Sequence, residues 1–185
     1  MIDKPLTLVF AHASRQLFHF HVETKFKLAY PHPDGRHYAT NLDGLREELF
    51  QPCHMEGDLI IRFPETMLPP HEQLQVGDLL LEVSESRRDG RVVVFTHSEH
   101  ILLRIQRRIR ETSRAETKIK EVKPDEYVIS IKRPQRGVGV IAEQVGILVF
   151  GKDATKPVEV RLDRDGSLLD EWPGGCFLER LGEIV

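Results

Sequence analysis

The chain has 185 residues, with 26 basic and 29 acidic side chains and a formal charge of −3. At 40% hydrophobic and 30% charged residues, the composition excludes a disordered tail. The slight acidity excludes a protein that binds nucleic acid through bulk charge alone. Apolar runs fall far short of the roughly 18 residues of a membrane span. With two distant cysteines and no signal-peptide pattern, we expect a cytoplasmic protein that does not enter a membrane.

Residues 1–56 form the first of three predicted segments, which contains strands and one helix. Residues 6–11 read as a strand, and the alternation of apolar and polar side chains over 17–29 predicts a strand with one wet face. The leucine spacing over 41–50 predicts a helix, with Asn41 as its N-cap.

Residues 57–122 form the second segment, and its pattern is the clearest in the chain. Residues 58–63 and 91–95 are short, nearly continuous apolar runs, as expected for strands covered on both faces. Helices are predicted over 71–86 and, after a Ser98 cap, over 98–111. Their predicted core residues are Leu74, Leu79, Leu80, Val83, Ile101, Leu102, Ile105 and Ile109. This order predicts a right-handed βαβ unit with parallel strands.

Residues 123–185 form the third segment, which is rich in turns. Short strands are predicted over 127–132, 146–151 and 158–162, and we expect them to form an antiparallel ribbon or a small appended sheet. The predicted fold class is therefore α/β. It combines a partial parallel sheet and flanking helices with a C-terminal antiparallel β segment.

Glu65 and His97 stand out because each follows a predicted buried strand. The carboxyl ends of parallel strands meet at one edge of a sheet, where such folds bind ligands. A carboxylate there suits the activation of water against a γ-phosphate, and a histidine there can contact the same phosphate. The simpler interpretation makes Glu65 a surface turn residue, and His97 and His100 a cap and a packed side chain.

Three runs of residues resemble a known family. Residues 64–70 (Pro-Glu-Thr-Met-Leu-Pro-Pro) resemble the Pro-Glu-x-x-Leu-His-Pro run after the Walker B strand of ABC/SMC-like AAA ATPases of the overcoming-lysogenization-defect-like group. Residues 96–100 are similar to the Thr-His-Ser switch-histidine run, and residues 165–177 to a closing Asp-Gly … Trp-Pro-x-Gly-Phe-Phe segment. The resemblance covers about residues 57–180. It implies an ATPase-like core over 57–122 and a possible rebuilt ATPase segment over 1–56.

The departures from this family determine the expected function. The sequence contains no GxxxxGK[ST] phosphate loop, and Arg62 stands where the family has an acidic residue that helps to hold Mg²⁺. We therefore expect a half-length, degenerate member that binds no cofactor alone, with ATP and Mg²⁺ bound only if a partner supplies the phosphate loop. The leading interpretation is a non-catalytic docking subunit in a bacterial assembly for antiviral defence or DNA maintenance. Its partner would be an ATPase or nuclease subunit. The alternative is one half of a split ATPase, to which Glu65 and His97 are contributed.

A basic run provides a third interpretation, a nucleic-acid-binding accessory. Its candidate contacts are Arg104, Arg107, Arg108, Lys118 and Lys120, although a solvated helix face explains the same pattern.

Histidines in the first segment raise the question of a metal site. His19 and His21 share one face of a predicted strand, near His12, but no carboxylate or cysteine follows at a recognisable spacing. We therefore expect no metal site, and a structural role for Cys53 and His54.

Overall fold

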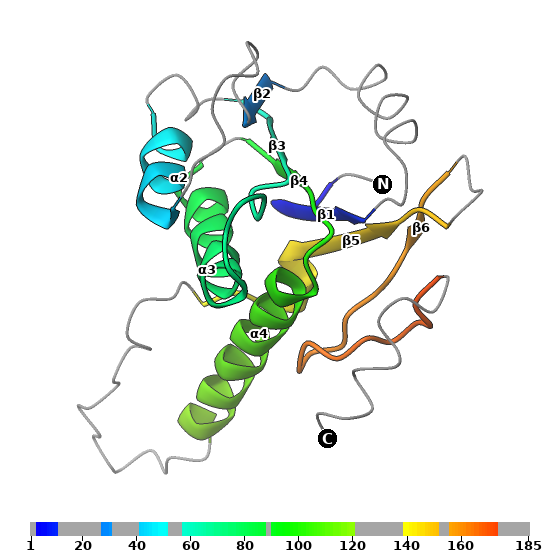
Figure 1. Ribbon diagram of the computed structural model, residues 1–185. Coiled ribbons are helices and arrows are strands. Elements are labelled where there is room, and N and C mark those ends of the chain that lie inside the picture. The colour runs from blue at the N-terminus through cyan, green and yellow to red at the C-terminus, as the bar shows by residue number, and fades with distance from the viewer. Residues whose placement is uncertain are drawn as a thin grey trace.

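A six-stranded sheet covered by helices organises the computed structural model of this chain (Figure 1). The structure describes residues 3–10, 27–30, 41–51, 57–87, 90–120, 139–151 and 156–173, with the backbone alone at 27–30 and 116–120. The strands lie in the order β2-β3-β4-β1-β5-β6. They are β1 (Leu6–Phe10), β2 (Lys27–Tyr30), β3 (Leu59–Arg62), β4 (Val92–Phe95), β5 (Val145–Val149) and β6 (Val158–Glu159). All neighbouring strands are parallel except β5 and β6.

The central strands are apolar on both faces because both faces of the sheet are buried. β1, β4 and β5 are buried along their whole length, and only the last residue of β3 is partly exposed. This burial confirms the two predicted middle strands and their parallel pairing. The α/β fold class is confirmed too, including a C-terminal antiparallel pair formed by β5 and β6.

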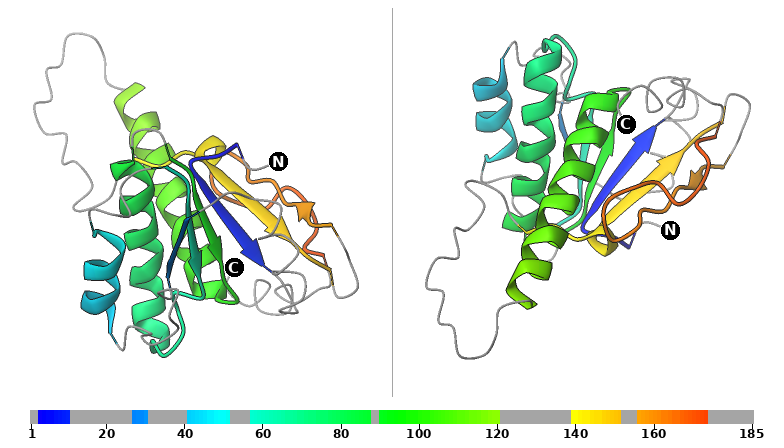
Figure 2. Two further views of the ribbon diagram at one scale, coloured as in Figure 1. Left: turned by 90° about the horizontal axis from the view of Figure 1, so that it is seen from above. Right: turned by 90° about the horizontal axis from the view of Figure 1, so that it is seen from below.

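Three helices cover the same face of the sheet (Figure 2). They are α2 (Leu42–Leu49), α3 (Pro70–Ser86) and α4 (Glu99–Lys120). The predicted cap of α2 is confirmed, since the Asn41 side chain accepts the Gly44 N–H at 2.9 Å. The predicted end of the last helix near Glu111 is too early. The regular spacing of apolar residues ends at Ile109, but the helix continues to Lys120. Polar contacts hold part of this extension, such as the 2.8 Å hydrogen bond from the Ser113 hydroxyl to Asp165.

Buried apolar side chains cover both faces of the sheet. A large cluster joins the helices to one face, and a smaller cluster on the other face contains Val9, Ile60, Val93, Phe95, Leu148 and Phe150. All the predicted core residues of α3 and α4 are buried except Leu74, which is 38% exposed. The buried stripe of α3 includes Val76 and Leu80, and Leu74 lies two residues before Val76. That spacing places it about 200° around the helix from Val76.

The C-terminal segment joins the main sheet instead of forming an appended one. β5 pairs in parallel with β1, so only β6 adds an antiparallel edge. A short 3₁₀ turn, η2 (Ala142–Gln144), precedes β5. The Trp172 ring packs edge-on against Phe10, with centroids 5.0 Å apart. The strand predicted over 127–132 lies outside the described residues. No helix in the described part of the chain is both long and apolar enough to span a membrane.

Candidate functional site at the carboxyl edge of the sheet

The loops that follow β3 and β4 meet at the carboxyl edge of the sheet. Arg62 and Phe95 are paired in the register of the two strands, and the Phe63 N–H donates to the Phe95 carbonyl at 2.7 Å. Beyond this bond, the Glu65 Oε1 atom accepts the backbone N–H of His97 at 2.7 Å. The structure therefore brings Glu65 and His97 together, as expected from the parallel strands. Their proposed roles toward a phosphate remain predictions.

Phe63, not Glu65, is the residue that directly follows β3. Its ring stacks on the His97 imidazole, with centroids 4.8 Å apart and planes 13° apart. Phe63 and Met67 both have left-handed backbone conformations, with φ of 49° and 69°. Such conformations are costly for side chains other than glycine and cluster at functional sites. Met67 is also 72% exposed, so this strained loop presents a large apolar side chain to solvent.

Hydrogen bonds tie both loops to the first turn of α3. The Ser98 hydroxyl donates to Gln73 Oε1 at 2.7 Å, and Gln73 Nε2 donates to the Leu68 carbonyl at 2.9 Å. The Ser98 N–H donates to Thr96 Oγ1 at 3.0 Å. We call residues 63–69, 73 and 96–98 the edge clasp. Its bonds connect two loops and a helix into one unit, so the positions of Glu65 and His97 are fixed by the fold.

The carboxylate of Glu65 faces the protein. Oε1 is bonded to the His97 N–H, and Oε2 is buried without a hydrogen-bond partner among the described residues. A general base must reach the proton that it removes. In this structure one oxygen of the carboxylate holds the loop at His97.

Arg62, the last residue of β3, is partly buried at the same edge. Within the described part of the chain no carboxylate pairs with it, and its buried Nε has no acceptor. This position is the one where a metal-binding acidic residue was expected from the resemblance. The sequence reasoning identified Arg62 only as a departure, and its lack of a partner emerges from the structure.

The predicted nucleic-acid contacts on α4 are engaged in ion pairs. Arg104 and Arg108 both donate to Asp78 on α3, at distances of 2.7–3.2 Å. Arg107 and Arg108 also donate to Glu111. Burial raises the pKa of Asp78, but hydrogen bonds from Arg108 and Arg104 outweigh it and lower that pKa below its usual value. These arginines therefore carry carboxylate partners of their own, while the side chains of Lys118 and Lys120 lie outside the described residues.

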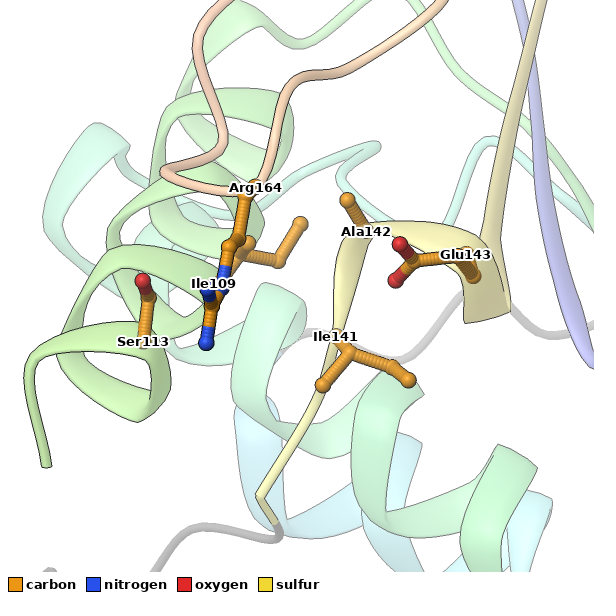
Figure 3. A pocket seen from close by; sticks show the side chains of 6 residues that line it. All are labelled: Ile109, Ser113, Ile141, Ala142, Glu143 and Arg164. Atoms are coloured by element: carbon orange, nitrogen blue, oxygen red, sulfur yellow. The ribbon is translucent and has the colours of Figure 1, made fainter. Parts of the chain in front are cut away.

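A pocket of about 230 Å³ lies between α4, η2 and the turn near Arg164 (Figure 3). Sequence reasoning did not find it, because its lining comes from segments far apart in the chain. The lining residues are Ile109, Ser113, Ile141, Ala142, Glu143 and Arg164. The Ser113 hydroxyl already donates to Asp165, and the pocket includes neither Glu65 nor His97.

The described residues contain no group of three or more metal-ligating side chains. His12, His19, His21, Cys53 and His54 lie outside them, so the question of metal binding by those residues stays at the level of the sequence. Compared with known proteins, the chain matches no family model, no curated protein and no solved structure.

Proposed function

We propose that this chain is a non-catalytic, ATPase-like subunit that docks onto a partner protein in a bacterial assembly for antiviral defence or DNA maintenance. The observation that carries the proposal is the use of Glu65 as a loop-holding carboxylate. Its Oε1 is bonded to the His97 N–H, and Phe63 stacks on the His97 ring. Phosphoryl transfer depends on positioning and charge stabilisation, and the 185 residues contain no phosphate loop to supply them.

The edge clasp supports a docking role because it is pre-organised. Hydrogen bonds hold both loops, and the strained backbone at Met67 presents that side chain to solvent. A surface that is already ordered loses little conformational entropy on binding. Heads of the resembled family act as pairs. The partner that we propose is therefore an ATPase subunit with a phosphate loop, or a nuclease subunit.

The test is native mass measurement of the chain co-expressed with the products of its neighbouring genes. We expect a defined complex that Met67→Glu weakens, because a charge in an apolar contact costs binding energy. The matched control is Leu169→Glu, since Leu169 is similarly apolar and 58% exposed but lies on the C-terminal hairpin. A chain that stays monomeric with every neighbour contradicts the proposal.

A split ATPase is the second candidate, and the meeting of Glu65 with His97 at one edge favours it. In this reading a separate polypeptide supplies the phosphate loop, and binding frees the Glu65 carboxylate from the His97 N–H. The test is ATP turnover by the reconstituted pair, repeated with Glu65→Gln. Turnover that is unchanged in the variant ends the idea. We rank the split ATPase second, because the cation of Arg62 at that position repels Mg²⁺.

A further inference from the structure

The pocket between α4, η2 and the turn near Arg164 has apolar walls and a charged rim (Figure 3). Ile109 and Ala142 are almost fully buried in its walls, whereas Ile141 is 40% exposed and leaves apolar surface in contact with water. The volume of about 230 Å³ is below the roughly 300–1,000 Å³ that is typical of pockets for drug-sized ligands. The pocket therefore suits a smaller molecule with an apolar part.

Hydrogen bonds hold both walls of this pocket in place. On one side, the Gln144 side chain accepts the Ile141 N–H at 3.1 Å, and the Gln144 N–H donates to the Ile141 carbonyl at 3.0 Å. On the other side, Asp163 Oδ1 accepts the Asp165 N–H at 2.9 Å, and the Asp165 carboxylate accepts the Ser113 hydroxyl at 2.8 Å. A pocket whose walls are already fixed loses little conformational entropy when a ligand binds.

Two opposite charges line the pocket from different elements. Figure 3 shows the Arg164 guanidinium beside α4 and the Glu143 carboxylate on the side of η2, with the pocket between them. Within the described residues the Glu143 carboxylate has no hydrogen-bond or ion-pair partner. The pocket therefore presents a cation on one side and a carboxylate with open acceptor sites on the other.

The neighbouring charges do not favour an ion of a single sign. Asp165 adjoins the pocket with a carboxylate that accepts the Ser113 hydroxyl, whereas Arg110 and Arg114 each follow a lining residue on α4. A simple cation would be repelled by the arginines, and a simple anion would be repelled by the carboxylates. A small ligand that carries both charges finds a complementary partner at each end.

We propose that this pocket binds a free amino acid with an apolar side chain. Arg164 pairs with the ligand carboxylate, because a planar guanidinium offers parallel donors that match its two oxygens. Glu143 accepts the ligand ammonium group. The apolar side chain of the ligand covers Ile141 and removes its exposed surface from water, which favours binding. The site contains no residue of the edge clasp, so it goes beyond the docking function and does not depend on it.

The test follows the backbone amide resonances of Ser113 and Ala142 in the ¹⁵N-labelled full chain by NMR. The probes are L-leucine, leucinamide, which lacks the carboxylate, and isocaproate, which lacks the ammonium group. We expect a saturable shift with leucine. We expect binding about tenfold weaker or worse with each of the other two, because each loses one charge-assisted contact. Glycine, which lacks the apolar side chain, should also bind more weakly than leucine.

Substitutions on the rim assign each contact. In Arg164→Gln, leucine and leucinamide should bind equally, because the carboxylate no longer has a guanidinium to meet. In Glu143→Gln, leucine and isocaproate should bind equally, because the ammonium group no longer has a carboxylate to meet. The controls are Lys156→Gln and Glu47→Gln, which remove exposed charges of the same two signs elsewhere and should leave the preference for leucine unchanged.

Three results overturn the proposal: no saturable shift with leucine, equal binding of leucine, leucinamide and isocaproate by the wild type, or an unchanged preference for leucine in both rim variants. Tighter binding of leucyl-leucine than of leucine overturns the assignment to a free amino acid. The ligand series is measured on the wild-type chain, so a variant that fails to fold leaves the test intact. No partner protein is present, so failure here is distinct from failure of the docking proposal.

Discussion

Asp78 is the junction between α3 and α4, and its substitution by asparagine tests the role of the α4 arginines most sharply. The carboxylate accepts from both Arg104 and Arg108, whose side chains are only 22% and 13% exposed. Asn keeps the shape of Asp, but its amide NH₂ group faces guanidinium donors. Asp78→Asn thus leaves two mostly buried cations short of an acceptor.

The expected cost follows from this burial. Losing charge-assisted hydrogen bonds in a partly buried network costs about 1.5–3 kcal/mol, below the cost of breaking a fully buried pair. For a domain of this size each 1 kcal/mol lowers Tm by roughly 2–4 °C, so we expect a fall of roughly 3–12 °C. α3 and α4 also pack closely beside Asp78. A Cβ at Gly77 would lie only 2.9 Å from the Arg104 Cβ, so the two helices are already in close contact at this point.

The assay is thermal unfolding followed by circular dichroism, with Glu47→Gln as the control. Glu47 is an exposed acid on α2, and the same removal of charge there should change Tm by about 1 °C or less. Equal Tm values for Asp78→Asn and Glu47→Gln would refute the reasoning. In that case the arginines of α4 would not depend on Asp78, and the nucleic-acid interpretation of that helix would regain support.

Three further predictions follow from other contacts. Glu65→Ala should lower the free energy of unfolding by about 1 kcal/mol, because the bond to the His97 N–H is lost. Hydrogen exchange of the His97 amide should become faster, and unchanged exchange would count against the edge clasp. Gly166→Ala should destabilise by about 2 kcal/mol or more, because Gly166 has a φ of 77° and a Cβ there meets the Gln106 carbonyl oxygen at 2.5 Å. Gly139→Ala is the control, since its Cβ meets nothing closer than 3.7 Å. Side-chain hydrogen bonds from Arg91 and Arg161 lower the pKa values of Asp58 and Asp170, and the pKa of Asp170 falls to about 2. The stability that these ionised carboxylates contribute is therefore complete above about pH 4 and is lost as the pH falls toward 2. A Tm that rises on acidification through that window contradicts this account.

The sequence was sufficient for the elements whose apolar pattern is strong. The runs that became β3 and β4 are continuously apolar because both faces are covered, and adjacent parallel strands then necessarily bring the loops at Glu65 and His97 to one edge. The Asn41 cap was predictable for a similar reason, because capping is a local interaction over three residues.

The remaining features depend on contacts between distant segments. The bond from the His97 N–H to Glu65 involves a backbone atom, which no residue pattern specifies. The role of Asp78 likewise depends on how α3 packs against α4. The place of β5 depends on its pairing with β1, a strand about 140 residues earlier in the chain. Side-chain pattern predicts which residues face a core, but not which polar groups meet across it.

The central claim is that Glu65 holds a loop and performs no hydrolysis, and the most direct measurement is steady-state phosphate release from ATP with Mg²⁺ by the chain alone. We predict no turnover above the buffer rate for the wild type, for Glu65→Gln or for His97→Ala, while Glu65→Ala accelerates exchange of the His97 amide. Turnover by the wild type that Glu65→Gln abolishes would contradict the account, because it would make the carboxylate a base toward water.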